Sequence, residues 1–226
     1  MGTPAPTTQQ PPLDISKALH ELFNEVISGT AHLNAARSLA EASKTHPVIM
    51  KASPSFFNLT IQAHLEAAQL SAARLFDEHR DCAGIPWLLK QAKNRREEFS
   101  CRSADELDDA IREAEGICAT ETSVLASLKL RRDRRLAHLD KKAIRDLEQF
   151  ANDTKLTYPE LEGLFACAEL ILNGMANQRG EAGFLTSDDD YDDLFHTLDL
   201  IEKGVKANAQ ELERRIGPCP ELSAGS

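Results

Sequence analysis

One short segment of the chain holds side chains suited to chemistry on a polyanion. Between Lys129 and Arg145 there are eight basic residues and only two acidic ones, so this segment carries a formal charge of +6. The whole chain has a net charge of -10, which leaves -16 on the remaining residues. Arginine presents a planar, permanently charged fork that suits phosphate oxygens. His138, inside the same segment, can move a proton near neutral pH. This focused positive charge on an acidic chain favours binding of a polyanion.

A phosphate clamp beside a proton-transferring group is a minimum set for cutting RNA without a metal ion. The ribose 2′-hydroxyl would attack the phosphate, and a histidine would act as general base or acid. An arginine would stabilise the charge that develops on the phosphate. A run of charges on a helix is also typical of a solvated surface, and basic residues in a last helical turn complement the helix dipole. From composition alone, the solvated surface is the interpretation that we favour.

Helical geometry brings only some of these residues together. On a regular helix Arg131 and His138 share a face because they are seven residues apart, and Arg134 and Arg135 lie one turn before His138 on its side. Arg132 is six residues from His138 and is rotated from it by about 120°. Arg132 and His138 therefore meet only at an irregular turn of the helix or across two chains.

The elements that must position this segment are predicted to be helices, since no stretch of useful length alternates as a strand does. We predict an all-α fold, an up-and-down bundle of about six to eight helices with no sheet. Gly29, His46-Pro47 and Gly116 are the predicted helix breaks. The predicted helices cover residues 13–26, 30–43, 54–77, 85–94, 104–139, 141–151, 157–178 and 187–215.

Composition and cysteine usage limit the kinds of protein that this chain can be. Residues 1–12 predict a disordered lead-in and residues 217–226 a flexible tail, on either side of a single domain at 13–216. No apolar run approaches the roughly 20 residues of a membrane helix, and the N-terminus lacks the features of a signal peptide. Five scattered cysteines suggest reduced thiols. We expect a cytoplasmic protein with no membrane partner.

Other candidate sites are weaker. The acidic stretch at 187–193 could hold a divalent cation but lacks the EF-hand spacing, and an acidic first turn of a helix explains it better. The histidines at 20, 32, 64 and 196 each stand alone in a helical pattern, and no HExxH arrangement occurs. We therefore expect no metal site and no cofactor.

Three stretches carry a family resemblance. The first is Arg132-Asp133, followed by four residues and His138, within a basic run that leads into Ala-His-x-Asp. The second is Ala-Arg-Leu-Phe-Asp at 73–77, followed by Trp-Leu-Leu at 87–89, and the third is Leu-Thr-Tyr-Pro-Glu-Leu at 156–161, leading to Asn173. Together they resemble HEPN domains of the abortive-infection, AbiU-like branch, over roughly residues 13–215.

This resemblance has concrete implications. HEPN domains are all-α, and their active members are typically metal-independent endoribonucleases that dimerise so that the motif of each chain lines one shared cleft. Carried onto this sequence, Arg132 would hold the scissile phosphate, His138 would transfer protons and Asp133 would support the arginine. Arg131 also lies within the permitted gap from His138, so which of the two arginines belongs to the motif stays open.

We therefore predict a toxin-like endoribonuclease of prokaryotic defence that acts as a homodimer on RNA and leaves a 2′,3′-cyclic phosphate. The resemblance gives catalytic roles to Arg132 and His138. Supporting roles fall to Asp133, Arg131 and Arg135, and contacts to RNA phosphates to Arg134, Lys141 and Lys142.

Two alternatives stay open. Many HEPN domains are toxins held by an antitoxin partner, and others are non-catalytic modules. The first alternative is therefore a dimeric helical module that binds a protein or RNA. The second is a scaffold whose arginines only pair with acids such as those at 188–193. Whether the chain is an enzyme stays open as well.

Overall fold

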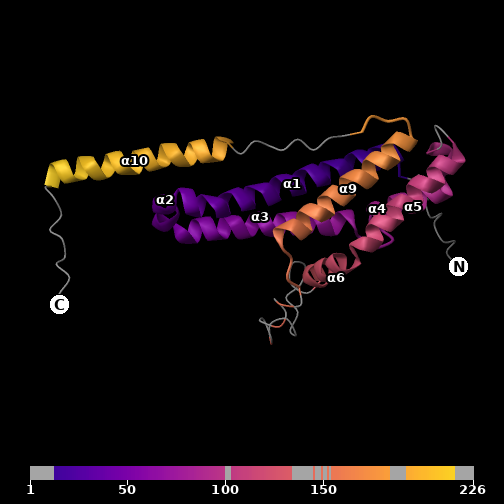
Figure 1. Ribbon diagram of the computed structural model, residues 1–226, viewed down its shortest axis with the longest axis horizontal. Coiled ribbons are helices and arrows are strands. Elements are labelled where there is room, and N and C mark those ends of the chain that lie inside the picture. Colours follow the sequence, from indigo (N-terminus) through magenta and orange to yellow (C-terminus); the bar gives the residue numbers. More distant parts are fainter. Residues whose placement is uncertain are drawn as a thin grey trace, which may run out of the picture. The chain divides into compact units, whose positions relative to one another are not determined.

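The computed structural model describes residues 13–99, 103–133, 154–183 and 192–216, together with Arg145, Gln149 and Asn152. Within this part the chain forms eight α-helices, one short 3-10 helix and no strand, which confirms the predicted all-α fold (Figure 1). The elements are α1 (Ile15–Thr45), α2 (Pro47–Ala52), α3 (Pro54–Leu75), α4 (Ile85–Asn94), η1 (Arg96–Glu98), α5 (Ala104–Thr120), α6 (Thr122–Arg131), α9 (Tyr158–Gln178) and α10 (Asp192–Ile216).

These elements divide into two compact units that are interleaved in the sequence. Unit 1 comprises Met1–Thr30 and Ala68–Thr186, and unit 2 comprises Ala31–Ala67 and Ser187–Ser226. Helices α1 and α3 each contribute residues to both units. The single domain at 13–216 stays a prediction.

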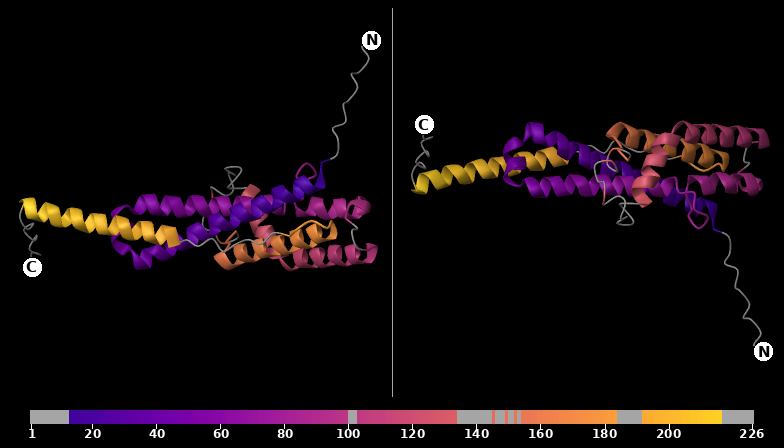
Figure 2. Two further views of the ribbon diagram at one scale, coloured as in Figure 1. Left: turned by 90° about the horizontal axis from the view of Figure 1, so that it is seen from above. Right: turned by 90° about the horizontal axis from the view of Figure 1, so that it is seen from below.

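The core of unit 1 is built around α9, which packs against α5 and α4 (Figure 2). One face of α9 is apolar at helical spacing, so its side chains are buried while the other face meets solvent. The buried apolar residues of this helix are Leu161, Leu164, Phe165, Ala168, Ile171, Leu172, Met175 and Ala176.

Local signals fix both ends of α9. At the start, the Thr157 hydroxyl accepts a hydrogen bond from the Glu160 N–H, and the Glu160 carboxylate accepts one from the Thr157 N–H, which completes a capping box. At the end, Gly180 adopts a φ of 72°, and the N–H of Glu181 donates to the carbonyl of Ala176 over 3.0 Å. This pattern is a Schellman motif, which favours glycine because of its left-handed backbone.

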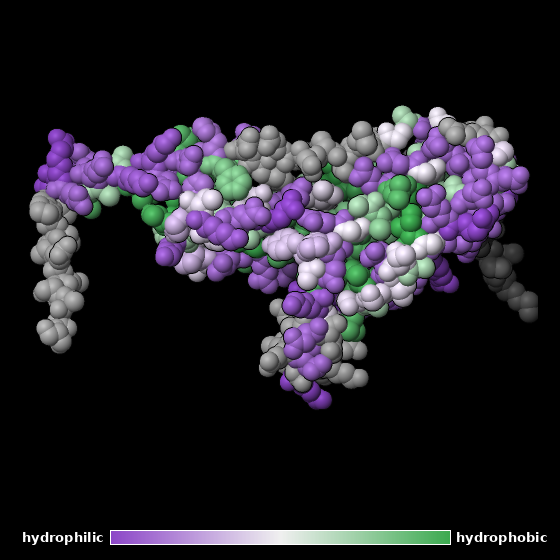
Figure 3. Space-filling view, viewed as in Figure 1, coloured by the Kyte–Doolittle hydropathy of each residue, from purple (hydrophilic) through white to green (hydrophobic). Residues whose placement is uncertain are grey.

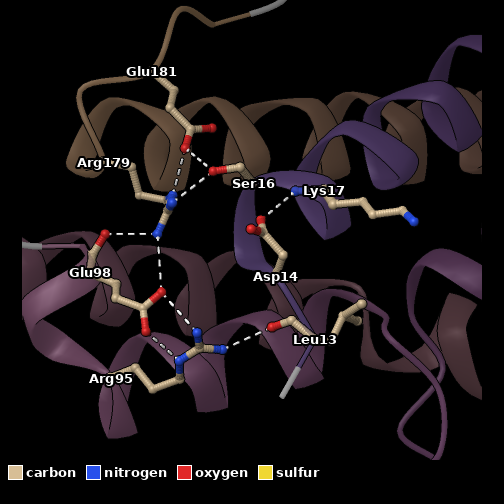
Figure 4. Close-up of polar contacts among 8 residues, drawn as sticks. All are labelled: Leu13, Asp14, Ser16, Lys17, Arg95, Glu98, Arg179 and Glu181. Atoms are coloured by element: carbon tan, nitrogen blue, oxygen red, sulfur yellow. Dashed lines mark hydrogen bonds and ion pairs between the residues drawn. The ribbon is translucent and has the colours of Figure 1, made fainter. Parts of the chain in front are cut away.

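The residue before that glycine, Arg179, ties three segments of unit 1 together (Figure 4). Its guanidinium donates to the Ser16 hydroxyl over 2.7 Å, to the Glu98 carbonyl over 2.8 Å and to the Glu181 carboxylate over 2.7 Å. It also lies over the ring of Phe99, 5.3 Å from the centroid. The start of α1, the turn after α4 and the end of α9 therefore share one cation.

The predicted break at Gly29 is wrong, because α1 runs without interruption from Ile15 to Thr45. Gly29 lies where α1 approaches α3 and α9 closely. A Cβ atom at this position would overlap the ring of Phe165 and come within 2.8 Å of the Ser71 Cβ. Glycine costs about 1 kcal/mol of helix propensity relative to alanine, and the close packing of buried Phe165 offsets that cost.

The helix predicted for residues 104–139 is also divided differently. It is interrupted at Glu121, between α5 and α6, and not at Gly116, which lies inside α5. The predicted break at His46-Pro47 is confirmed, since α1 ends at Thr45. Helix α2 begins directly after His46, because proline is accepted in a first helical turn.

Unit 2 has a small core of its own and two polar contacts between helices. Its apolar cluster consists of Leu39, Ala42, Ile49, Met50, Phe57 and Leu198, with Ile61, Leu194 and Phe195 packed against it. The His46 Nε2 atom lies 2.9 Å from Asp199 Oδ1, which joins α10 to the residue before α2. His32 of α1 and His64 of α3 share a hydrogen bond of 2.8 Å between their Nδ1 atoms.

Alanine at position 29 should destabilise the protein. We expect Gly29→Ala to lower the free energy of unfolding by about 1–3 kcal/mol, because the added methyl overpacks a buried contact. The matched control is Gly116→Ala, also inside a helix, where a Cβ would meet nothing within 4 Å. That variant should be neutral or more stable by about 0.5–1 kcal/mol. Urea denaturation followed by circular dichroism measures both, and equal effects would contradict the packing role of Gly29.

The histidine pair should make stability depend on pH. Burial and the electrostatic effect of the neighbouring His32 lower the pKa of His64 below its ordinary value of 6.5. Below that pH the unfolded chain binds a proton at His64 that the folded chain does not. The free energy of unfolding therefore falls as the pH drops through 6.5. His64→Gln should reduce this fall between about pH 7.5 and pH 5.5 in urea titrations. An unaltered pH dependence in His64→Gln would refute the assignment.

Candidate functional site

The described part of the arginine motif lies at the end of α6. Helix α6 ends at Arg131, and the backbone turn widens to a π-type turn at Arg132 and Asp133. The Arg132 N–H is shared between the carbonyls of Leu128 and Lys129. Such wide turns occur frequently at functional sites. The sequence predicted that Arg132 would need either an irregular turn or a second chain to reach His138, and an irregular turn begins at Arg132.

The Arg132 side chain is held between two carboxylates. Its Nη1 lies 2.7 Å from Asp77 Oδ2, and its Nε lies 2.8 Å from Asp133 Oδ1. The side chains of Arg132 and Asp77 are 24% and 20% exposed, so water screens this ion pair less than one on the open surface. Against the effect of burial, the two carboxylates raise the pKa of Arg132, so the guanidinium stays charged.

Asp77 is itself fixed by the turn that follows α3. Its Oδ1 accepts a hydrogen bond of 3.0 Å from the His79 N–H, and the Cys82 thiol also hydrogen-bonds to the carboxylate. Burial raises the pKa of Asp77, but the His79 N–H and the Arg132 charge outweigh it, so the pKa lies below its ordinary value. Burial and the neighbouring carboxylate raise the pKa of Cys82. Asp77 is therefore an ionised acceptor and Cys82 a neutral donor.

A pocket of about 430 Å³ opens beside this ion pair in unit 1. It is formed by the end of α3, the start of α4, the end of α5 and the length of α6. Its apolar wall includes Phe76, Leu125 and Leu128. Its charged lining residues are Asp77, Glu78, Glu115, Lys129 and Arg132. Three acids and two bases therefore line the pocket, and Lys129 Nζ lies 3.6 Å from a Glu78 carboxylate oxygen.

The two neighbouring arginines have different surroundings. Arg132 lines the pocket, whereas Arg131 donates from Nη1 to the carbonyl of Thr154 over 3.4 Å. Thr154 is fully buried and lies shortly before α9. Arg131 therefore connects the end of α6 to the approach to α9, and Arg132 is the one placed beside an open volume.

The remaining predicted site residues lie outside the described part of the chain: His138, Arg134, Arg135, Lys141 and Lys142. Of the acidic stretch at 187–193, only Asp192 and Asp193 are described, and they begin α10. In the described residues no three His, Cys, Asp or Glu side chains gather as a metal site would require. None of the described helices has the length and apolar character needed to span a membrane.

Sequence reasoning did not include Asp77 among the site residues. The residue belongs to the Ala-Arg-Leu-Phe-Asp stretch, which carried part of the family resemblance, and it is 55 residues from its partner Arg132. The structure thus brings two of the resembling stretches into direct contact. Asp77 is the one acidic residue of the Ala-Arg-Leu-Phe-Asp stretch. A search of the resembling stretches for an acid that could pair with the arginine of the motif could have found Asp77.

Comparison with known proteins bears on the same residues. The family model described as AbiU2, of the HEPN group, matches residues 13–196. The chain belongs to this family. The match spans both Asp77 and Arg132, so the ion pair lies within the family region of this AbiU2 protein. No curated protein and no solved structure matches the chain.

Removing the charge of Asp77 should cost more stability than removing a surface charge. We expect Asp77→Asn to lower the free energy of unfolding by about 1–2 kcal/mol, because a shielded, charge-assisted hydrogen bond is weakened. The control is Asp109→Asn, whose ion pair with Arg112 has an N–O distance of 2.6 Å but is 70% or more exposed on both sides. That change should cost less than about 1 kcal/mol. Equal losses in urea denaturation would show that the Arg132–Asp77 pair is no better shielded than a surface pair.

Proposed function

We propose that this AbiU2-family protein is a metal-independent endoribonuclease of the abortive-infection type, with Arg132 and His138 as its catalytic residues. The observation that carries the proposal is the ion pair between Arg132 and Asp77, which fixes the motif arginine beside a pocket. The family assignment supports it, because the HEPN resemblance gives an arginine and a histidine these roles.

The chemistry needs only groups that the sequence supplies. His138 would remove the proton of a ribose 2′-hydroxyl, whose oxygen then attacks the neighbouring phosphorus. Arg132 would stabilise the negative charge that develops on the phosphate oxygens. The bond from phosphorus to the 5′-oxygen breaks, and that oxygen takes up a proton. The products are a 2′,3′-cyclic phosphate and a 5′-hydroxyl.

Asp77 and Asp133 would act as positioning residues in this scheme. A guanidinium has five N–H donors in one plane, and the two carboxylates bind it through Nη1 and Nε. Holding the plane in one orientation lets the donors that remain meet a phosphate without an added entropic cost. The partner that would complete the site is a second copy of the chain, as the HEPN resemblance implies.

The other basic residues extend the proposed RNA contact. Arg134, Lys141 and Lys142 would bind phosphates on either side of the cut, and Arg131 and Arg135 would support the site. The described part of the basic run is already balanced by acids at Asp77, Asp133 and Glu78. Beyond the contact of Arg132 with the scissile phosphate, the positive charge that attracts RNA would therefore come from the residues after Asp133. An antitoxin that covers these residues would hold the enzyme inactive.

The same charge balance favours a second candidate, a HEPN module that binds a protein or RNA without cutting it. In this case Arg132 would serve the fold through Asp77 and would not meet a phosphate. RNA would then bind with a steep dependence on salt, or not at all, and would stay intact.

Cleavage assays separate the two functions. Purified protein should cut single-stranded RNA in the presence of EDTA, and the new 3′ ends should carry a 2′,3′-cyclic phosphate. Arg132→Ala and His138→Ala should each reduce the rate by about 10²–10⁴-fold. Arg112→Ala removes an exposed arginine of α5 that does not line the pocket, and its rate should equal that of the parent.

Two results would argue against the proposal, the first against its mechanism and the second against the nuclease itself. Cleavage by His138→Ala at the parental rate would remove histidine from the mechanism. Retention of RNA by the parent with no cleavage product, under any tested salt concentration, would favour the binding module.

A further inference from the structure

Helix α10 carries an apolar stripe along one face. Its members recur at alternating intervals of four and three residues, the spacing of helices that pack along a common seam. One polar residue, Asn208, occupies a position in this stripe. Figure 3 shows hydrophobic side chains among the hydrophilic ones along α10. The stripe consists of Leu194, Leu198, Ile201, Val205, Asn208 and Leu212.

The chain covers only the first part of this stripe. Leu198 is 2% exposed and belongs to the apolar cluster of unit 2, and Leu194 packs against that cluster. From there on the stripe is open in the described part of the chain: Ile201 is 46% exposed, Val205 42% and Leu212 56%. The family match ends at residue 196, so the open part of the stripe lies beyond the region that the family shares.

We propose that the exposed part of this stripe binds the same part of a second copy of the chain, with the two α10 helices antiparallel. A face that packs on its own copy through a two-fold axis is self-complementary, as isologous interfaces require. Pairing Ile201 of one copy with Leu212 of the other places Val205 level with Asn208. All of the exposed stripe is then used.

The packing already present in unit 2 decides the direction. In the antiparallel register, Ile216 of the second copy lies level with residue 197, so that helix ends where the packing of Leu198 on its own chain begins. In a parallel pair, the two copies of Leu198 would lie level with each other, but each is already enclosed by its own cluster. Only the antiparallel pair leaves both clusters intact.

The charges of α10 favour the same direction. The segment from Asp192 to Glu202 has four acidic residues and no lysine or arginine, a formal charge of -4. The segment from Lys203 to Ile216 has four basic and two acidic residues, a formal charge of +2. In the register above, Asp199 of one helix lies level with Arg214 of the other and Glu202 lies level with Glu211, whereas a parallel pair sets every charged residue level with its own copy.

Sedimentation equilibrium of the full chain tests the interface. The parent should self-associate, and Ile201→Glu combined with Val205→Glu should raise the dissociation constant of this contact by about tenfold or more. Leu200→Glu is the matched control, because Leu200 is 54% exposed on the same helix but lies off the stripe. It should associate as the parent does, and circular dichroism should show equal helix content in all three proteins.

Disulfide cross-linking tests the direction. In a chain whose five cysteines, Cys82, Cys101, Cys118, Cys167 and Cys219, are serine, Ile201→Cys mixed with Leu212→Cys should form a cross-linked dimer on oxidation. Neither variant alone should do so, because the two copies of residue 201 are eleven residues apart along the pair, about 16 Å. That distance exceeds the roughly 7 Å that a disulfide spans between Cα atoms.

Four results would overturn the proposal: a monomeric parent, equal weakening by Leu200→Glu, efficient cross-linking of Ile201→Cys with itself, or association that survives the double glutamate variant without the mixed cross-link. A dimer formed only through the arginine motif would appear as association that survives the double glutamate variant without the mixed cross-link. None of these measurements uses RNA, so a chain that does not cut RNA still tests this interface.

Discussion

The shielded pair of charges formed by Arg132 and Asp77 constrains the rest of unit 1. A guanidinium that is only 24% exposed needs hydrogen-bond acceptors within the protein, because it has lost much of its water. Asp77 meets that need only if the end of α3 and the end of α6 lie a side chain apart. The His79 N–H and the Cys82 thiol then hold the carboxylate in place. The pocket lies where these helix ends converge.

The sequence predicted the fold best where the determining forces are local. Helices were predicted to begin near residues 104 and 157, and α5 and α9 begin there because caps within one helical turn fix their starts. The Ser103 hydroxyl accepts a hydrogen bond from the Glu106 N–H, and the Thr157 hydroxyl accepts one from the Glu160 N–H. Gly29 was misread because glycine ends many helices, whereas its role depends on a phenylalanine 136 positions further along the chain, at 165. Nothing near Gly29 in the sequence carries that information, since it arises from the packing of α1 against α9.

For the candidate site too, sequence reasoning named some of the residues and missed others. The family resemblance singled out Arg132 and Asp133, whose roles stay predictions, and the backbone turn at these two residues is irregular. Asp77 was noticed only as part of a resembling stretch, because an ion pair across 55 residues has no periodic signature. Likewise, nothing in the sequence indicated that the charge of Glu78 lies beside the charge of Lys129. The net charge of a segment shows how many charges it holds but not which of them another segment neutralises.

The interleaving of the two units affects the order in which the protein can assemble during synthesis. Unit 1 needs α9, and unit 2 needs α10, so each unit is completed by a segment that is distant in sequence from its first helix. His46 is translated 153 residues before its partner Asp199, an interval of roughly 8–30 s at 5–20 residues per second. During that time the apolar residues around Leu39 and Ile49 lack the cover of Leu198. The nascent chain therefore exposes one hydrophobic surface until α10 has been synthesised, and a chain cut before α10 would retain that exposure.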